Sequence, residues 1–126
     1  MGKPAESVEN YLETILILGQ NGEVVRSVDI ANELGYSKPS ISVAMKNLKA
    51  NGYIEIEKGG QIVLTETGRD IAQRIYSRHT LISDLLIFLG VDSEIAVKDA
   101  CKMEHGMSEE SFTALENHLE DLKQRI

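Results

Sequence analysis

The chain has 126 residues, which is enough for one compact unit or for two very small units that share a core. Its 42% hydrophobic and 26% charged residues are typical of an ordinary soluble protein, and its longest apolar run, Leu85 to Leu89, is far too short to span a bilayer. The net charge of −7 disfavours nucleic acid as a partner, but the charge is unevenly spread. Between residues 24 and 61, five basic side chains stand against four acidic ones, so the acidity lies outside this segment.

The N-terminal residues and the cysteine content both indicate where in the cell the protein is found. Met1 to Pro4 leads into polar residues, which does not resemble a secretion signal. The single cysteine, Cys101, excludes an internal disulfide and fits a reducing compartment. We therefore expect a cytoplasmic protein with no membrane partner, in which Cys101 is available as a ligand or for redox chemistry.

The first half of the chain predicts three helices. Apolar residues at helical spacing indicate a helix from Ser7 to Leu18. Two short helices follow, and we expect Ser27 to cap the first and Ser37 to cap the second. Pro39 is tolerated in the first turn of the second helix, because the N–H that proline lacks has no helical partner there. Two short helices joined by a tight turn with a glycine are typical of a helix-turn-helix.

A hairpin is predicted directly after these helices. Residues 53–57 alternate between apolar and polar, as a half-buried strand does, and Gln61 to Leu64 can pair back onto them. Lys58, Gly59 and Gly60 would form the turn between the two strands. A hairpin after a helix-turn-helix indicates a winged helix.

The second half predicts three more helices. Thr65 can cap a long helix to about Phe88, with His79 in its apolar stripe. Ser93 can cap a helix that carries Cys101, Glu104 and His105, and a last helix begins near residue 108. The predicted fold class is mainly α with a small β-hairpin: a winged helix-turn-helix DNA-binding domain over residues 1–70, then a helical domain over residues 71–126.

The second helix of the helix-turn-helix is expected to enter the major groove of duplex DNA. Small hydroxyls let such a helix approach the bases closely, apolar groups can pack on thymine methyls, and lysines suit phosphates. Because these basic residues are few, a homodimer that reads two half-sites is expected, with the acidic second half facing away from the DNA. The predicted DNA-binding residues are Ser37, Lys38, Pro39, Ser40, Ser42, Val43, Lys46, Lys49 and Lys58.

One helical segment near the end of the chain suggests a metal site. On a helix, Cys101, Glu104 and His105 project the same way and could fill half or more of a transition-metal shell. The same three residue types also fall together by chance in many helices. Taken alone, His79 is more often a buried packing histidine, and Glu13 is more often a surface carboxylate.

The chain resembles the diphtheria-toxin-repressor family of iron- and manganese-dependent transcriptional regulators over nearly its whole length. The resemblance rests on four segments, at residues 9–15, 64–68, 78–79 and 100–108. It implies a short, two-domain regulator whose second domain binds metal and makes the dimer. The ligands that it implies are Asn10, Glu13, His79, Cys101, Glu104 and His105.

Position 10 departs from both metal types of this family, and position 101 departs from the manganese type alone. Manganese-type members carry Asp at position 10 and Glu at position 101, whereas iron-type members carry Met and Cys there; this chain has Asn10 and Cys101. Val97 and Ser83 stand where iron-type members have the ligands of an ancillary site, which is therefore expected to be absent. Because a thiolate favours softer ions than Mn²⁺, we expect Fe²⁺ first and Mn²⁺ second, with Co²⁺, Ni²⁺ or Zn²⁺ binding in vitro.

The resemblance implies a repressor of metal-uptake genes, not an enzyme, with double-stranded operator DNA as its partner and no small-molecule substrate. Three alternatives stay open. The first is a metal-independent winged-helix regulator that senses a small ligand or the oxidation of Cys101. The second is a cysteine hydrolase that uses Cys101 with His105 or His79, although no oxyanion-hole segment is apparent. The third is a winged helix that binds proteins rather than DNA.

Overall fold

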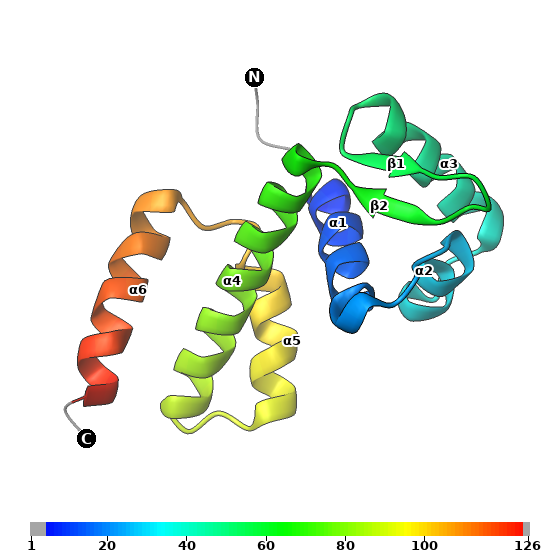
Figure 1. Cartoon of the computed structure of the whole chain (residues 1–126). Coiled ribbons are helices and arrows are strands. Elements are labelled where there is room, and N and C mark those ends of the chain that lie inside the picture. The colour runs from blue at the N-terminus through cyan, green and yellow to red at the C-terminus, as the bar shows by residue number, and fades with distance from the viewer. Residues whose placement is uncertain (1–4, 125–126) are drawn as a thin grey trace. The chain divides into compact units, whose positions relative to one another are not determined.

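The structure is a computed structural model that describes residues 5–124, so Met1 to Pro4 lies outside the described residues. It consists of helices and one hairpin, which confirms the predicted fold class (Figure 1). No described helix has the length and apolar character needed to cross a membrane. The elements are α1 (Glu6–Leu18), a 3-10 helix (Gln20–Gly22), α2 (Ser27–Leu34), α3 (Lys38–Ala50), β1 (Ile54–Ile56), β2 (Ile62–Leu64), α4 (Glu66–Phe88), α5 (Ser93–Met103) and α6 (Glu109–Gln124).

The chain divides into two compact units, residues 1–74 (unit 1) and residues 75–126 (unit 2), with α4 contributing to both. In unit 1, α1 contacts α2 and β2, and α3 contacts α2 and β1. The inward faces of these elements form one apolar core, whose burial is the main stabilising contribution in a unit of this size. Its fully buried members include Leu12, Ile30, Ile41, Met45, Leu48 and Ile54.

The hairpin is short and antiparallel. Ile54 pairs with Leu64 and Ile56 pairs with Ile62, so these four side chains lie on the core face, and Val63 lies on the other face opposite Glu55. The carbonyl of Val25 accepts a hydrogen bond of 2.8 Å from the Ile62 N–H, which holds the loop before α2 against β2. The wing is therefore attached to the helix-turn-helix by backbone as well as by packing.

A close backbone contact joins the hairpin to the start of α4. Thr65 donates from its hydroxyl to the Gly52 carbonyl at 2.7 Å and accepts from the Gly68 N–H at 3.1 Å, which confirms Thr65 as the cap. A Cβ at Gly68 would lie 2.0 Å from the carbonyl oxygen of Tyr53, far inside contact distance. Position 68 therefore requires glycine.

In unit 2, each helix buries a narrow stripe. Ile75 and Ile82 on α4 are completely or almost completely buried, as are Ala96 and Ala100 on α5. Alanines at these two positions let α5 approach its neighbours closely. Phe112 and Leu119 supply the buried face of α6.

Three local predictions are wrong. Arg26, not Ser27, is the N-cap of α2, because the Asp29 side chain accepts the Arg26 N–H at 2.9 Å. Asp92, not Ser93, caps α5: the carboxylate one residue earlier reaches the Glu94 N–H at 3.1 Å. Finally, α5 ends at Met103, so Glu104 is its C-cap residue and His105 lies in the turn that follows.

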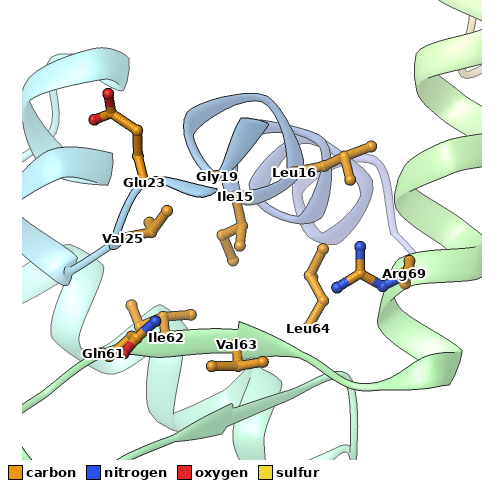
Figure 2. A pocket seen from close by; sticks show the side chains of 10 residues that line it. All are labelled: Ile15, Leu16, Gly19, Glu23, Val25, Gln61, Ile62, Val63, Leu64 and Arg69. Carbon is orange, nitrogen blue, oxygen red and sulfur yellow. The ribbon is translucent and has the colours of Figure 1, made fainter. Parts of the chain in front are cut away.

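A cavity of about 150 Å³ lies within unit 1, between the end of α1, β2 and the first turns of α4 (Figure 2). Figure 2 shows Ile15 and Leu64 pointing into it and the carboxylate of Glu23 pointing away. Arg69 is the basic residue of its lining. A cavity of this volume is large enough for a molecule the size of benzene.

Candidate metal centre and nucleic-acid interface

Three potential ligands converge in unit 2 from two helices. His79 lies in the middle of α4, Cys101 lies in the last turn of α5, and Glu104 follows directly after α5. One ligand atom from each of these residues lies within 4.8 Å of the other two. The Nδ1 atom of His79 is 3.0 Å from Oε2 of Glu104 and 3.7 Å from Sγ of Cys101. An imidazole, a thiolate and a carboxylate at this spacing could provide three ligands of a metal coordination sphere.

The three ligands differ sharply in their exposure. Glu104 is completely buried, the His79 side chain is 19% exposed, and Cys101 is exposed. The group is thus shielded from solvent at the Glu104 carboxylate and open to solvent at the Cys101 thiol, where an ion could enter. Burial of a carboxylate is costly unless a cation or hydrogen-bond donors compensate it.

His105 contacts the other oxygen of the same carboxylate. Its Nε2 atom lies 3.4 Å from Oε1 of Glu104, and the side chain is buried. Glu104 is therefore flanked by His79 on one oxygen and by His105 on the other. The structure gathers His79, Cys101 and Glu104 into one group, and it places His105 beside that group rather than within it.

The two remaining predicted ligands belong to unit 1. Asn10 and Glu13 lie on α1, where Asn10 is exposed and Glu13 is buried. Their role as ligands stays a prediction that rests on the family resemblance. The fully buried acidic residue of α1 is Glu9, to which sequence reasoning gave no role. Its position three residues before the buried Leu12, on the inward face, was the available signal.

The proposed DNA-reading helix has the expected outward face. Ser37 caps α3 by accepting the Ser40 N–H at 3.3 Å, which confirms that prediction. All nine predicted DNA-binding residues are exposed, whereas Ile41, Met45 and Leu48 of α3 are buried. Val43 is 60% exposed and so lies on the outward face of α3.

Arg26 is a residue near the wing that sequence reasoning missed. Its Nε atom donates to the Gly59 carbonyl at 3.4 Å, which connects the N-terminus of α2 to the turn that carries Lys58. Among the residues that the structure describes, no acidic side chain forms an ion pair with Lys38, Lys46 or Lys58. These ammonium groups are therefore available for phosphates.

Comparison with known families covers almost the whole chain. Residues 4–61 match the family model described as "Iron dependent repressor, N-terminal DNA binding domain". Residues 65–125 match the model described as "Iron dependent repressor, metal binding and dimerisation domain". The chain belongs to the iron-dependent repressor family. The resemblance to the diphtheria-toxin-repressor family is thereby confirmed.

Individual members of the family agree with this assignment. The chain is 32% identical to the helix-turn-helix-type transcriptional regulator MJ0568 of Methanocaldococcus jannaschii, over 97% of this chain and 99% of that protein. It is 38% identical to the transcriptional regulator MntR of Escherichia coli O6:H1, over 86% of this chain and 70% of MntR. Among solved structures, that of the manganese regulator SloR superposes with a TM-score of 0.78 at 26% identity, covering 94% of this chain and 55% of SloR. These relatives are transcriptional regulators rather than enzymes, which argues against the hydrolase alternative.

Membership of this family assigns general roles to the regions that contain α3 and the cluster of His79, Cys101 and Glu104. The family models divide the chain into a DNA-binding part, which contains α3, and a metal-binding part, which contains His79, Cys101 and Glu104. The cluster on α4 and α5 thus falls in the region that the family uses for metal. The family models are named for iron, whereas one of these relatives is called MntR and another a manganese regulator.

Proposed function

We propose that the chain is a metal-dependent transcriptional repressor that binds operator DNA as a homodimer in the cytoplasm. Residues 1–70 would form the DNA-binding domain, and residues 71–126 would form the metal-sensing and dimerisation domain. The family membership supports the general role. The observation that carries the proposal is the convergence of His79, Cys101 and Glu104 within 4.8 Å in unit 2.

The donor set favours Fe²⁺ over Mn²⁺ as the physiological ion. Mn²⁺ prefers hard oxygen ligands, whereas a thiolate and an imidazole suit softer or borderline ions. Here only Glu104 of the three clustered ligands is a hard anion. The general order of affinities also places Fe²⁺ above Mn²⁺ at sites with nitrogen and sulfur ligands. We therefore propose a repressor of metal-uptake genes that responds to Fe²⁺, with Mn²⁺ as the second candidate.

Within unit 2, each residue would have a distinct part in binding the ion. Glu104 supplies a buried carboxylate, His79 supplies Nδ1 from the middle of α4, and Cys101 supplies the exposed sulfur. A bound cation would offset the burial of the carboxylate and hold the end of α5 against α4. His105 contacts the second oxygen of Glu104 and would orient that carboxylate. Asn10 and Glu13 are further proposed ligands, on the strength of the resemblance.

Metal would control DNA binding by shifting a conformational equilibrium. An ion that binds one arrangement of the dimer more tightly raises the population of that arrangement. Coupling of about 2–3 kcal/mol would raise operator affinity by roughly 30- to 150-fold. On the DNA side, Ser37, Ser42 and Val43 would meet base edges, while Lys46 and Lys58 would meet phosphates.

The test is DNA binding to the chain's own upstream region, measured by fluorescence anisotropy under anaerobic conditions at fixed salt. We expect strong stimulation by Fe²⁺ relative to chelator, and weaker stimulation by Mn²⁺. Glu104→Gln and Cys101→Ser should remove the stimulation, whereas the matched control Glu110→Gln, at an exposed position of α6, should not. Full metal response in both site variants would refute the assignment of the ligands.

One alternative has a specific observation in its favour. The cavity in unit 1, which is lined by apolar side chains together with Glu23, Gln61 and Arg69, could hold a small ligand of a metal-independent regulator (Figure 2). Such a regulator should bind DNA equally well with chelator and with metal.

A winged helix that binds only proteins should show no salt-dependent affinity for duplex DNA.

A further inference from the structure

Arg78 is a buried cation in unit 2 to which neither sequence reasoning nor the proposed metal site assigns a role. It lies on α4 directly before His79 and is only 2% exposed. Its Nη1 atom donates to the carbonyls of Glu104, at 3.1 Å, and Met107, at 2.7 Å. Its Nη2 atom donates to the Glu109 carboxylate at 2.7 Å, and its guanidinium carbon lies 5.5 Å from the centre of the Phe112 ring.

These contacts place the guanidinium at the turn between α5 and α6. The last carbonyls of a helix have no partner within the helix, and a cation near them is favoured by the helix dipole. Arg78 supplies both the donors and the charge there, and its planar fork can hold several acceptors at fixed angles. The turn that it organises, residues 104–107, begins with the proposed ligand Glu104.

Arg78 and His79, which are neighbours on α4, therefore both contact Glu104, one at its main chain and the other at its side chain. Arg78 holds the main-chain carbonyl of Glu104, and His79 contacts its side-chain carboxylate at 3.0 Å. A carbonyl held in this way restricts the backbone torsions of Glu104, and so limits where its carboxylate can lie. Groups that orient a metal ligand in this manner usually change metal affinity when they are removed.

We propose that Arg78 is a positioning residue for the metal centre, which holds the main chain of Glu104 so that its carboxylate is preset toward His79 and Cys101. The inference rests on the proposed function, because it assumes that these three residues bind the ion. It differs from a purely structural role, in which Arg78 would connect α4 to α6 through Glu109 and Phe112 without affecting the ligands. The two roles make different predictions for variants of equal stability.

The experiment uses the full chain with Co²⁺ under anaerobic conditions, because the visible spectrum of Co²⁺ reports on thiolate ligation and geometry. The affinity for Co²⁺ is measured by competition with a chelating dye, and the stability of the metal-free protein by urea unfolding. Arg78→Lys keeps the charge but not the fork. Leu119→Val is the matched control, since it loosens the buried face of α6 and leaves the Glu104, Met107, Glu109 and Phe112 partners of Arg78 in place.

We expect Arg78→Lys to weaken Co²⁺ binding by about tenfold or more and to change the Co²⁺ spectrum. Leu119→Val should lower stability while its affinity and spectrum stay close to wild type. The positioning role is refuted if Arg78→Lys leaves both affinity and spectrum unchanged, or if Leu119→Val weakens binding as much at equal loss of stability.

Two further variants keep the result interpretable. If Arg78→Lys does not fold, Glu109→Ala removes the exposed partner that orients the guanidinium and should weaken Co²⁺ binding a few-fold. An unchanged affinity in that variant then refutes the inference. Cys101→Ser tests the underlying site separately. If it alters neither affinity nor spectrum, the ion is bound elsewhere, and both the proposed ligand set and the role of Arg78 are wrong.

Discussion

Replacement of Glu104 by glutamine should have opposite effects on the metal-free and the metal-loaded protein. The substitution keeps the shape of a completely buried side chain but removes its negative charge. In the metal-free protein, a neutral amide avoids the cost of burying a carboxylate and can still donate to or accept from the two flanking histidines. We therefore expect the urea midpoint of the metal-free variant to equal or exceed that of wild type.

With metal present, the order should reverse. At a metal concentration 100 times its dissociation constant, wild type gains about 2.7 kcal/mol of stability from binding. Glutamine removes one of the two anionic donors of the cluster. If this weakens binding by about 100-fold, the gain at the same concentration falls to about 0.4 kcal/mol. Wild type should then be the more stable protein by roughly 2 kcal/mol.

The assay is urea unfolding followed by circular dichroism, with chelator and with Mn²⁺, which tolerates air better than Fe²⁺. Glu110→Gln serves as the control, because it makes the same chemical change at an exposed site. The reasoning is refuted if metal stabilises Glu104→Gln as much as wild type. It is also refuted if the metal-free variant loses several kcal/mol, because the carboxylate would then be stabilising without an ion.

Other substitutions test the stability of the DNA-binding unit and its contacts with DNA. Gly68→Ala should destabilise the protein by about 1–3 kcal/mol or more in thermal unfolding, because its Cβ would meet the Tyr53 carbonyl at 2.0 Å. Ser37→Ala should cost about 1 kcal/mol through loss of the α3 cap, and an unchanged melting temperature would contradict that role. Lys46→Ala should weaken binding to all DNA sequences alike and reduce the slope of log affinity against log salt by about 1. Val43→Ala should instead reduce the preference for operator over random DNA, measured by competition, by about tenfold or less.

Local structure was predictable where one residue decides it. Ser37 and Thr65 cap α3 and α4 as expected, because each has a hydroxyl at the point where the apolar pattern of a helix begins. The same rule failed at Ser27 and Ser93. At Ser27, the capping carboxylate lies inside the helix, at Asp29. At Ser93, the acidic residue one position earlier, Asp92, makes the stronger cap. At Ser93, the sequence alone does not tell whether the serine or the adjacent Asp92 is the cap.

The candidate metal centre was predictable only in part, because its members are far apart in sequence. Helical spacing placed Cys101 and Glu104 on one face, and both do reach His79. The arrival of His79 from 22 residues upstream depends on how α4 and α5 pack, which periodicity does not encode. The resemblance to a known family supplied that residue. Helical spacing also extended α5 too far and placed His105 within the helix, which ends at Met103.

Arg78 illustrates why the supporting residues of a site are harder to predict than its ligands. A ligand is recognised by its donor atom, but a buried arginine has its effect through the backbone carbonyls that it reaches, and any residue type can provide those. The Arg78 guanidinium donates directly to the Glu104 and Met107 carbonyls, and these hydrogen bonds do not require an ion. The turn after α5 would then be ordered before metal arrives, and little binding energy would be lost in ordering it. The proposed role of Arg78 thus assigns the ordering of the candidate metal centre to a residue that would not touch the ion itself.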